Sequence, residues 1–346
     1  MPSLLHCASE ETHMVALVGI DLERDGKQHG HLAIPHSTHH SAYGQIKVPV
    51  TYLRNGYGPR ALLSAGVHGD EFEGQITLSK LALELSSEDI KGSLLILPMA
   101  NAPAVAASSR VSPLDQLNLN RVFPGNALAR PTEAIAHAIE TLLLARCDYA
   151  FDIHSGGTSL NYDAIGITAS TGDKAGDNAR LNLLNALDLD RGLLLSTNDE
   201  MGLDCSLDGA MLRQGVVGIS AEFGGGGGLS PALQLQCAQS VQRFLTSIGL
   251  IPGSPDVSKV HQTKMYSVDC PEAYVFSSSS GIFVAETRIG QTVEKDDILG
   301  QIHDLLDLSL PPLTVRSELP GTVLCLRALP RVESGDCLVQ IGRAIP

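Results

Sequence analysis

The stretch ALLSAGVHGDE, residues 61–71, begins as a short apolar run, turns at a glycine and ends in a histidine and two acids. An apolar run of this length, bounded by glycine, predicts a buried strand over residues 61–65. The residues that follow have the apolar spacing of a helix over residues 72–85. A strand, a tight turn and a helix in this order are typical of α/β proteins with a parallel sheet.

The same alternation continues along the chain. Short apolar runs predict further strands over residues 93–98, 149–153 and 216–221, and helical patterns predict helices over residues 132–145 and 231–247. We therefore expect an α/β fold in which a mainly parallel mixed sheet is sandwiched by helices.

A change of character near residue 250 predicts a second domain. The best linker candidate is the segment 250–258, which contains two prolines and a glycine. Beyond it, GIFV at 281–284 and GTVL at 321–324 are each followed by valine, aspartate, leucine and isoleucine. The spacing from valine to isoleucine is the same in both copies, and one residue is lost before the valine: Val293, Asp297, Leu299 and Ile302, then Val332, Asp336, Leu338 and Ile341. Two like units predict a β-rich barrel-sandwich domain over residues 253–346, after an α/β domain over residues 1–252.

This half-repeat resembles the biotinyl/lipoyl carrier fold. Carrier domains of that kind present a modified lysine at the turn between their halves. The corresponding stretch here, residues 304–317, contains no lysine. We therefore expect a structural module, or one that covers a neighbouring active site, rather than a carrier.

Side chains that bind metals follow three of the predicted strands. His68 and Glu71 follow the first strand, His154 follows the strand over 149–153, and Glu222 follows the strand over 216–221. In an open parallel sheet, ligands bind outside the carboxyl ends of the strands, so these segments converge at one edge. A single histidine after a strand is common by chance, and it is the joint placement of these residues that indicates a site.

Two imidazoles and one carboxylate form a ligand set typical of catalytic zinc, which keeps a fourth position open for water. We therefore predict one Zn²⁺ per chain, held by His68, Glu71 and His154. Glu222 is then the natural general base, taking a proton from the water and passing it to a leaving nitrogen. Asp152, two residues before His154, either orients a ligand imidazole or is an acid at a strand end.

Arginines supply candidate groups for an anionic substrate. Arg110 and Arg121 follow the strand predicted over residues 93–98, and Arg213 shortly precedes the strand that leads to Glu222. A guanidinium group can hold a carboxylate with two parallel hydrogen bonds. Each of these arginines can equally be a surface charge.

Two other clusters are left out of the predicted site. The glycines at 224–228 lack the lysine of a P-loop and the spacing of a dinucleotide fingerprint, so close approach to a substrate or a flexible rim fits better than phosphate binding. The early histidines lie in a segment punctuated by glycine, serine and proline, and we interpret them as surface or strand-edge residues: His29, His31, His36, His39 and His40.

The composition excludes several classes of partner. The 346-residue chain has a net charge of −14, which argues against nucleic acid because that affinity comes from clustered Lys and Arg. Its 7 cysteines are scattered without a C-x-x-C pair, which predicts reduced thiols in a reducing compartment. There is no signal-peptide pattern and no apolar run near the roughly 18 residues that span a bilayer, so we expect a cytoplasmic protein with no membrane partner.

Four motifs, in order, resemble those of the succinylglutamate desuccinylase/aspartoacylase family: HGDE at 68–71, NLNR at 118–121, DIHSGG at 152–157 and AEFG at 221–224. Members of this family are zinc enzymes related in fold to the zinc carboxypeptidases, and the similarity runs from about residue 20 to the C-terminus. The resemblance implies the same three zinc ligands and the same base. It also implies a set of substrate-binding residues: Asn120, Arg121, Arg110 and Arg213.

Three further stretches look like the branch of that family that contains N-acetyl-diaminobutyrate deacetylases: GKQHGH at 26–31, SSRVSP at 108–113 and the glycines at 224–228. The resemblance implies hydrolysis of the amide bond of a small N-acylated amino acid, with N-acetyl-diaminobutyrate as a candidate. Alternatives are deacylation of N-succinylglutamate or N-acetylaspartate, peptide cleavage by a zinc carboxypeptidase, and a non-catalytic binding protein.

A substrate derived from diaminobutyrate carries an ammonium group, which needs a nearby acid. Asp163, Asp199 and Glu200 lie between the strands that end at His154 and Glu222, and each is either such an acid or a solvated loop residue. We expect a mono-acylated diamino acid to be preferred to a dicarboxylate. The sequence leaves a homo-oligomer open.

Overall fold

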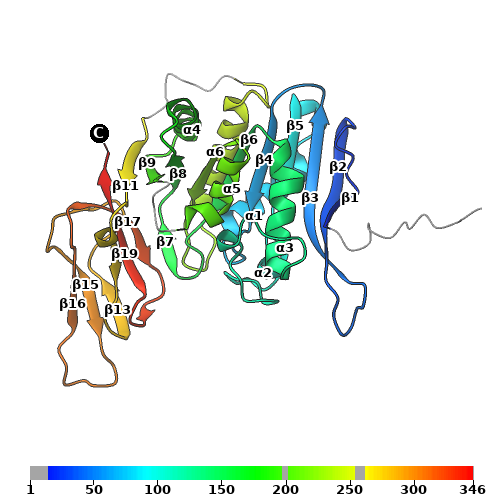
Figure 1. Cartoon of the computed structure of the whole chain (residues 1–346). Coiled ribbons are helices and arrows are strands. Elements are labelled where there is room, and N and C mark those ends of the chain that lie inside the picture. The colour runs from blue at the N-terminus through cyan, green and yellow to red at the C-terminus, as the bar shows by residue number, and fades with distance from the viewer. Residues whose placement is uncertain (1–14, 197–201, 254–261, 346) are drawn as a thin grey trace, which may run out of the picture.

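The computed structural model describes residues 15–196, 202–253 and 262–345. A mixed sheet with helices on both faces forms most of the molecule, and a β-rich part follows at the C-terminal end (Figure 1). This is the predicted fold class. In the part of the chain described, none of the helices combines the length and the apolar character needed to cross a bilayer.

The helices and strands have the following bounds. The α-helices are α1 (Phe72–Glu84), α2 (Ala102–Ala106), α3 (Pro131–Ala138), α4 (Lys174–Ala186), α5 (Leu207–Arg213) and α6 (Pro231–Ser247). The strands before residue 253 are β1 (Ala16–Val18), β2 (Gly26–Pro35), β3 (Gln45–Asn55), β4 (Arg60–Ala65), β5 (Gly92–Leu97), β6 (Tyr149–His154), β7 (Leu160–Tyr162), β8 (Ile165–Ser170), β9 (Arg191–Ser196) and β10 (Val217–Glu222). The later strands are β11 (Lys264–Ser267), β12 (Tyr274–Phe276), β13 (Gly281–Ala285), β14 (Thr292–Val293), β15 (Ile298–His303), β16 (Leu313–Arg316), β17 (Gly321–Arg327), β18 (Arg331–Val332) and β19 (Cys337–Ala344).

The four strands predicted from apolar runs are neighbours in the centre of the sheet, in the order β5-β4-β6-β10. They pair in parallel, whereas β3 and β8 pair with β5 and β10 in the antiparallel sense. Parallel pairing places the carboxyl ends of the four central strands at one edge of the sheet. The residues that follow these strands therefore lie close together.

Helices cover the sheet in two layers, and alternate residues of each strand face one layer or the other. Leu62 and Ala150 pack in the core that includes α3 and α5, while Leu63 and Phe151 pack in the core that includes α1, α4 and α6. Both faces are thus buried, which explains why the central strands are nearly continuous apolar runs.

The helices differ in how well the sequence predicted them. Helices α1 and α6 agree with the prediction to within a residue, and α3 is shorter because the chain changes to a π-helical turn at Ile139–Leu143. Helices α2, α4 and α5 were not predicted. Helices α2 and α5 have five and seven residues, too few to show a helical period, and α4 buries little besides Leu183 and Leu184.

The C-terminal repeat folds as two like hairpins, β13 with β15 and β17 with β19. The aspartate of each copy closes the same turn: Asp297 Oδ2 accepts the N–H of Glu294 at 2.8 Å, and Asp336 Oδ2 accepts the N–H of Glu333 at 2.9 Å. The shared spacing of the two copies therefore reflects a shared turn as well as a shared apolar pattern.

Strand pairing crosses the boundary predicted at residue 252. Strand β11 lies after that point yet runs parallel to β9, and β7 lies before it yet pairs with β17 (Figure 1). The division into two domains stays a prediction. The pairing does show that the C-terminal strands are hydrogen-bonded into the sheet that carries the candidate site.

Candidate active site

The turn between β4 and α1 depends on two glycines. Gly66 has a φ of +70°, a conformation that residues with a side chain rarely adopt. At Gly69 a Cβ atom would lie 2.0 Å from the carbonyl oxygen of Ala104, so any larger residue would force the backbones apart. The tight turn places His68 and Glu71 at the carboxyl end of β4.

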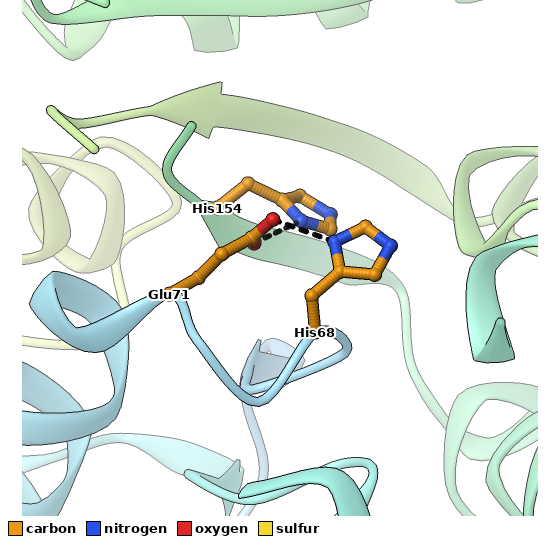
Figure 2. A group of neighbouring side chains, drawn as sticks. All are labelled: His68, Glu71 and His154. Carbon is orange, nitrogen blue, oxygen red and sulfur yellow. Dashed lines mark hydrogen bonds and ion pairs between the residues drawn. The ribbon is translucent and has the colours of Figure 1, made fainter. Parts of the chain in front are cut away.

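The three predicted metal ligands converge at this edge of the sheet (Figure 2). Glu71 receives one imidazole on each carboxylate oxygen: His68 Nδ1 lies 2.6 Å from Oε1, and His154 Nδ1 lies 2.9 Å from Oε2. All three side chains are buried, and their potential ligand atoms lie within 4.8 Å of one another. Among the described residues this is the group arranged to hold a metal ion, and the early histidines are not part of it.

The far nitrogen of each imidazole has its own acceptor. His68 Nε2 lies 3.1 Å from Asn118 Oδ1, and His154 Nε2 lies 2.6 Å from Asp152 Oδ2. In the neutral tautomer that a metal ion requires, these acceptors would hold the proton on Nε2, and Nδ1 would be the ligand atom. The donor set therefore fits a metal ion, and the position of Asp152 matches the orienting role considered for it.

Charges within the cluster shift the pKa values of its members. Burial opposes ionisation of Glu71, but His68 and His154 outweigh burial and lower the pKa of this carboxyl well below its usual range. Burial likewise opposes protonation of His154, yet Asp152 and Glu71 raise its pKa well above the usual value. The carboxylates thus stabilise positive charge here, which suits a cation.

A band of polar side chains crosses the sheet beneath the cluster. Ser64 and Ser220 lie in register with Asp152 on its two sides, and Ser64 Oγ donates to Asp152 Oδ1 at 2.5 Å. Each is the polar interruption of an otherwise apolar strand, on the face covered by α5. The sequence analysis did not identify either serine, although both stand out in the sequence as polar residues within apolar runs.

Glu222 lies beside the cluster, at the last position of β10 and in register with His154. Its Oε2 is buried and has no hydrogen-bond partner among the described residues. Burial, together with the charge of Glu71, raises the pKa of Glu222 to about 8. The carboxyl group is therefore available to exchange a proton with a molecule next to the cluster.

A cavity of about 320 Å³ opens over these residues. Ligand sites range over roughly 300–1,000 Å³, so this one suits a small molecule. Arg110, Asn120 and Arg121 line it together with the three predicted ligands and Glu222. Arg110 contacts the cluster, with Nη1 3.4 Å from His68 Nδ1 and 3.5 Å from Glu71 Oε1.

Asn120 and Arg121 line the cavity from a short 3₁₀ helix, Leu119–Arg121. The Oδ1 of Asn120 accepts the N–H of Leu207 at 2.8 Å, which ties this segment to the first turn of α5. Arg121 donates from Nη1 to the carbonyl oxygen of Asn120 at 2.7 Å. Both residues are thus positioned at the wall formed by α5.

Arg213 is the predicted site residue that the structure places elsewhere. It is the last residue of α5, and it is the first turn of that helix, not the last, that reaches the cavity. The guanidinium group instead holds Glu140, with Nη2 2.9 Å from Oε2 and Nε 3.2 Å from Oε1. This geometry gives Arg213 a structural partner away from the described residues that line the cavity.

Replacing Arg213 by Met should therefore lower stability and leave KM unchanged. Glu140 is buried and would keep only the bond from Gln214 Nε2 at 3.2 Å. Losing its guanidinium partner should therefore cost about 2 kcal/mol of the free energy of unfolding, as is usual for a buried charge that loses its cationic partner. Denaturant unfolding and steady-state kinetics measure the two effects. The double variant with Glu140→Gln should unfold less readily than Arg213→Met alone. A raised KM with unchanged stability would restore Arg213 to the substrate site.

Of the three acids considered for an ammonium group, the structure describes Asp163, which does not line the cavity. Asp163 pairs with Arg191 at 3.0 Å, and its side chain is 54% exposed. Asp199 and Glu200 lie outside the described residues. Instead Asp208, in the first turn of α5, lines the cavity. Sequence reasoning missed it because α5 was too short to be predicted.

The C-terminal strands form another wall of the cavity. Tyr274, Gln340, Cys325 and Tyr162 are successive register partners across β12, β19, β17 and β7, and all four line the cavity. Gln340 is 6% exposed, and its Oε1 has no hydrogen-bond partner among the described residues. Residues of the C-terminal strands thus line one side of the cavity, and the covering role considered for this part of the chain stays a prediction.

Comparison with known proteins agrees with this geometry. Residues 57–248 match the succinylglutamate desuccinylase/aspartoacylase catalytic domain. Over 331 residues, 94% of each chain, the protein is 32% identical to the N-alpha-acetyl-L-2,4-diaminobutyric acid deacetylase of Halomonas elongata. The chain therefore belongs to the succinylglutamate desuccinylase/aspartoacylase family, a family of metal-dependent deacylases.

Solved structures give the same result. The product-bound ectoine utilization protein EutE (DoeB) from Ruegeria pomeroyi superposes with a TM-score of 0.89 at 34% identity, covering 96% of this chain and 99% of that one. A succinylglutamate desuccinylase/aspartoacylase from Rhodobacter sphaeroides superposes with a TM-score of 0.89 at 28% identity, covering 96% of this chain and 100% of that one. The similarity therefore includes the β-rich C-terminal part.

Proposed function

We propose that this protein uses one zinc ion to hydrolyse the amide bond of a small N-acylated amino acid, and that N-acetyl-diaminobutyrate is its preferred substrate. The observation that carries the proposal is the arrangement of His68, Glu71 and His154 around one point, with Glu222 beside them and a small cavity above. The relatives named for diaminobutyric acid deacetylation and ectoine utilization support the choice of substrate.

His68 Nδ1, His154 Nδ1 and the Glu71 carboxylate would hold the metal, since these atoms already converge. A zinc ion bound there supplies a Lewis acid that polarises the scissile carbonyl and lowers the pKa of water to about 7. Glu222 accepts the proton of the attacking water and delivers it to the amide nitrogen as the C–N bond breaks. The products are a carboxylic acid and a free amino group.

The remaining residues of the cavity bind and orient the substrate. Arg110 and Arg121 supply guanidinium groups for its carboxylate, and Asn120 keeps the Arg121 segment in place through its bond to Leu207. The row of residues from β12, β19, β17 and β7 limits the space beside Glu222. A closed wall of this kind favours a small acyl group over a peptide.

The test is a comparison of kcat/KM for N-acetyl-diaminobutyrate, N-acetylaspartate, N-succinylglutamate and a panel of peptides, using the zinc-loaded protein. We expect the highest value for N-acetyl-diaminobutyrate and no measurable cleavage of the peptides. A higher value for either dicarboxylate would contradict the proposed substrate and leave the zinc mechanism in place. Cleavage of peptides alone would indicate a carboxypeptidase.

A further inference from the structure

Asp208 lines the cavity, but the hydrolysis proposed above does not use its carboxylate. Among the described residues that line the cavity, the other acids are Glu71 in the metal cluster and Glu222 beside it. Asp208 lies instead on α5, the helix whose first turn is tied to the Arg121 segment. Its side chain therefore lies on the same wall of the cavity as Arg121.

The hydrogen bonds of Asp208 leave its charge without a cationic side chain. Ser220 Oγ donates to Oδ1, and no Arg or Lys of the described residues pairs with the carboxylate. Burial raises the pKa of Asp208, and the nearby charge of Asp152 adds to this. The bond from Ser220, the charge of His154 and the backbone N–H of Asp208 itself oppose the shift without cancelling it. An ionised Asp208 would therefore be stabilised by a cation brought into the cavity.

A purely structural role as a helix cap does not account for Asp208. The Oγ of Ser206, the residue before α5, accepts the N–H of Gly209 at 3.1 Å, and Asn120 Oδ1 accepts the N–H of Leu207 at 2.8 Å. These acceptors already satisfy free N–H groups of the first turn. The carboxylate of Asp208 is thus not needed there, and its side chain lies at the cavity.

The neighbours of Asp208 indicate which kind of molecule would bring a cation into the cavity. Arg121 lines the same cavity, and the bond between Asn120 and Leu207 joins its segment to the turn that carries Asp208. One wall therefore presents a fixed positive group and a fixed negative group. A small molecule with one carboxylate and one ammonium group matches this pair of charges.

We propose that Asp208 is a specificity-determining residue that binds the side-chain ammonium group of the substrate while Arg121 binds its carboxylate. The inference rests on the proposed deacylase function and extends it to the residue that recognises the ammonium group of a diamino acid. A substrate with a second carboxylate in place of the ammonium would bring like charges together at Asp208. The same residue thus selects for diamino acids and against dicarboxylates.

The experiment replaces Asp208 by Asn, which has nearly the same shape, can still accept a hydrogen bond from Ser220 and carries no charge. We expect kcat/KM for N-acetyl-diaminobutyrate to fall about 10- to 100-fold, the usual effect of losing a hydrogen bond between charged groups. The value for N-acetyl-2-aminobutyrate, which lacks the ammonium group, should change little. Calorimetry should show the same loss of affinity for the product 2,4-diaminobutyrate.

Two further variants complete the design. Asp163→Asn removes an acid that pairs with Arg191 outside the cavity, so it should retain the substrate preference of the unmodified protein. Asp208→Glu keeps the charge and should retain a preference for the ammonium-bearing substrate. If Asp208→Asn does not fold, as judged by circular dichroism and zinc content, the preference of Asp208→Glu and the calorimetry of Asp208→Ser decide the question.

The outcomes separate the inference from the proposed function. If the unmodified protein prefers N-acetyl-diaminobutyrate and Asp208→Asn keeps that preference, the inference is overturned and the function stands. If the unmodified protein hydrolyses N-acyl amino acids with no preference for ammonium-bearing substrates, the inference and the proposed substrate are overturned and the deacylase mechanism stands. An equal loss on the charged and the neutral substrate would show that Asp208 positions other groups and does not bind the ammonium.

Discussion

Glu222→Gln should keep its zinc and lose about a hundredfold to ten-thousandfold in kcat, the usual effect of removing a general base. The amide of glutamine has nearly the shape of the carboxyl group but cannot accept the proton of the attacking water. Glu222 lies beside His154 without being one of the three ligands, so the metal should remain. Elemental analysis and steady-state kinetics on the same preparation measure the two properties.

A matched control for this variant is Glu73→Gln. Glu73 is a buried acid near the same turn, its Oε1 accepts the N–H of Ser230, and it does not line the cavity. We expect it to lower kcat far less than Glu222→Gln does. Near-normal turnover of Glu222→Gln with full zinc would assign the proton transfer to another group.

His154→Ala should abolish both tight zinc binding and activity. Three protein ligands are the number that catalytic zinc sites normally use, and the variant would leave two. The imidazole of His154 also contacts Asp152 through Nε2 and Glu71 through Nδ1, so its loss removes a hydrogen-bond partner from both carboxylates. Zinc content after dialysis against a weak chelator, together with hydrolysis of N-acetyl-diaminobutyrate, measures the effect.

His40→Ala is the control for loss of a histidine as such, because His40 is exposed and lies outside the metal cluster. It should bind one zinc ion per chain and retain full activity. His68→Ala is a second test of the cluster, because this variant removes one ligand and keeps the contact between Asp152 and His154. Stoichiometric zinc in both His68→Ala and His154→Ala would mean that the metal is held elsewhere.

The sequence predicted the features that follow from local patterns. The central strands were visible as apolar runs because both of their faces are buried. The convergence of His68, Glu71 and His154 followed from parallel pairing, which places the ends of neighbouring strands at one edge. The C-terminal repeat was visible because each copy uses the same aspartate to close the same turn.

The features that were not predicted depend on contacts between distant segments. Arg213 was expected at the substrate because it is close in sequence to Glu222. In the structure it lies in the last turn of α5, where its guanidinium group pairs with Glu140. Asp208 was missed because seven residues do not reveal a helix. The wall of the cavity combines β7 with strands more than a hundred residues later, and no local pattern encodes that pairing.

The continuous strand pairing across residue 252 has a consequence for the length of acyl chain that the protein accepts. Strand β7 joins the wall to the segment that follows His154, and β11 joins β19 to the sheet that carries the ligands. The spacing between wall and ligands is therefore held by backbone hydrogen bonds and does not change by rotation of one part about a linker. Each methylene added to an acyl group would have to fit within the same volume, so we expect discrimination against longer acids to rest on steric exclusion.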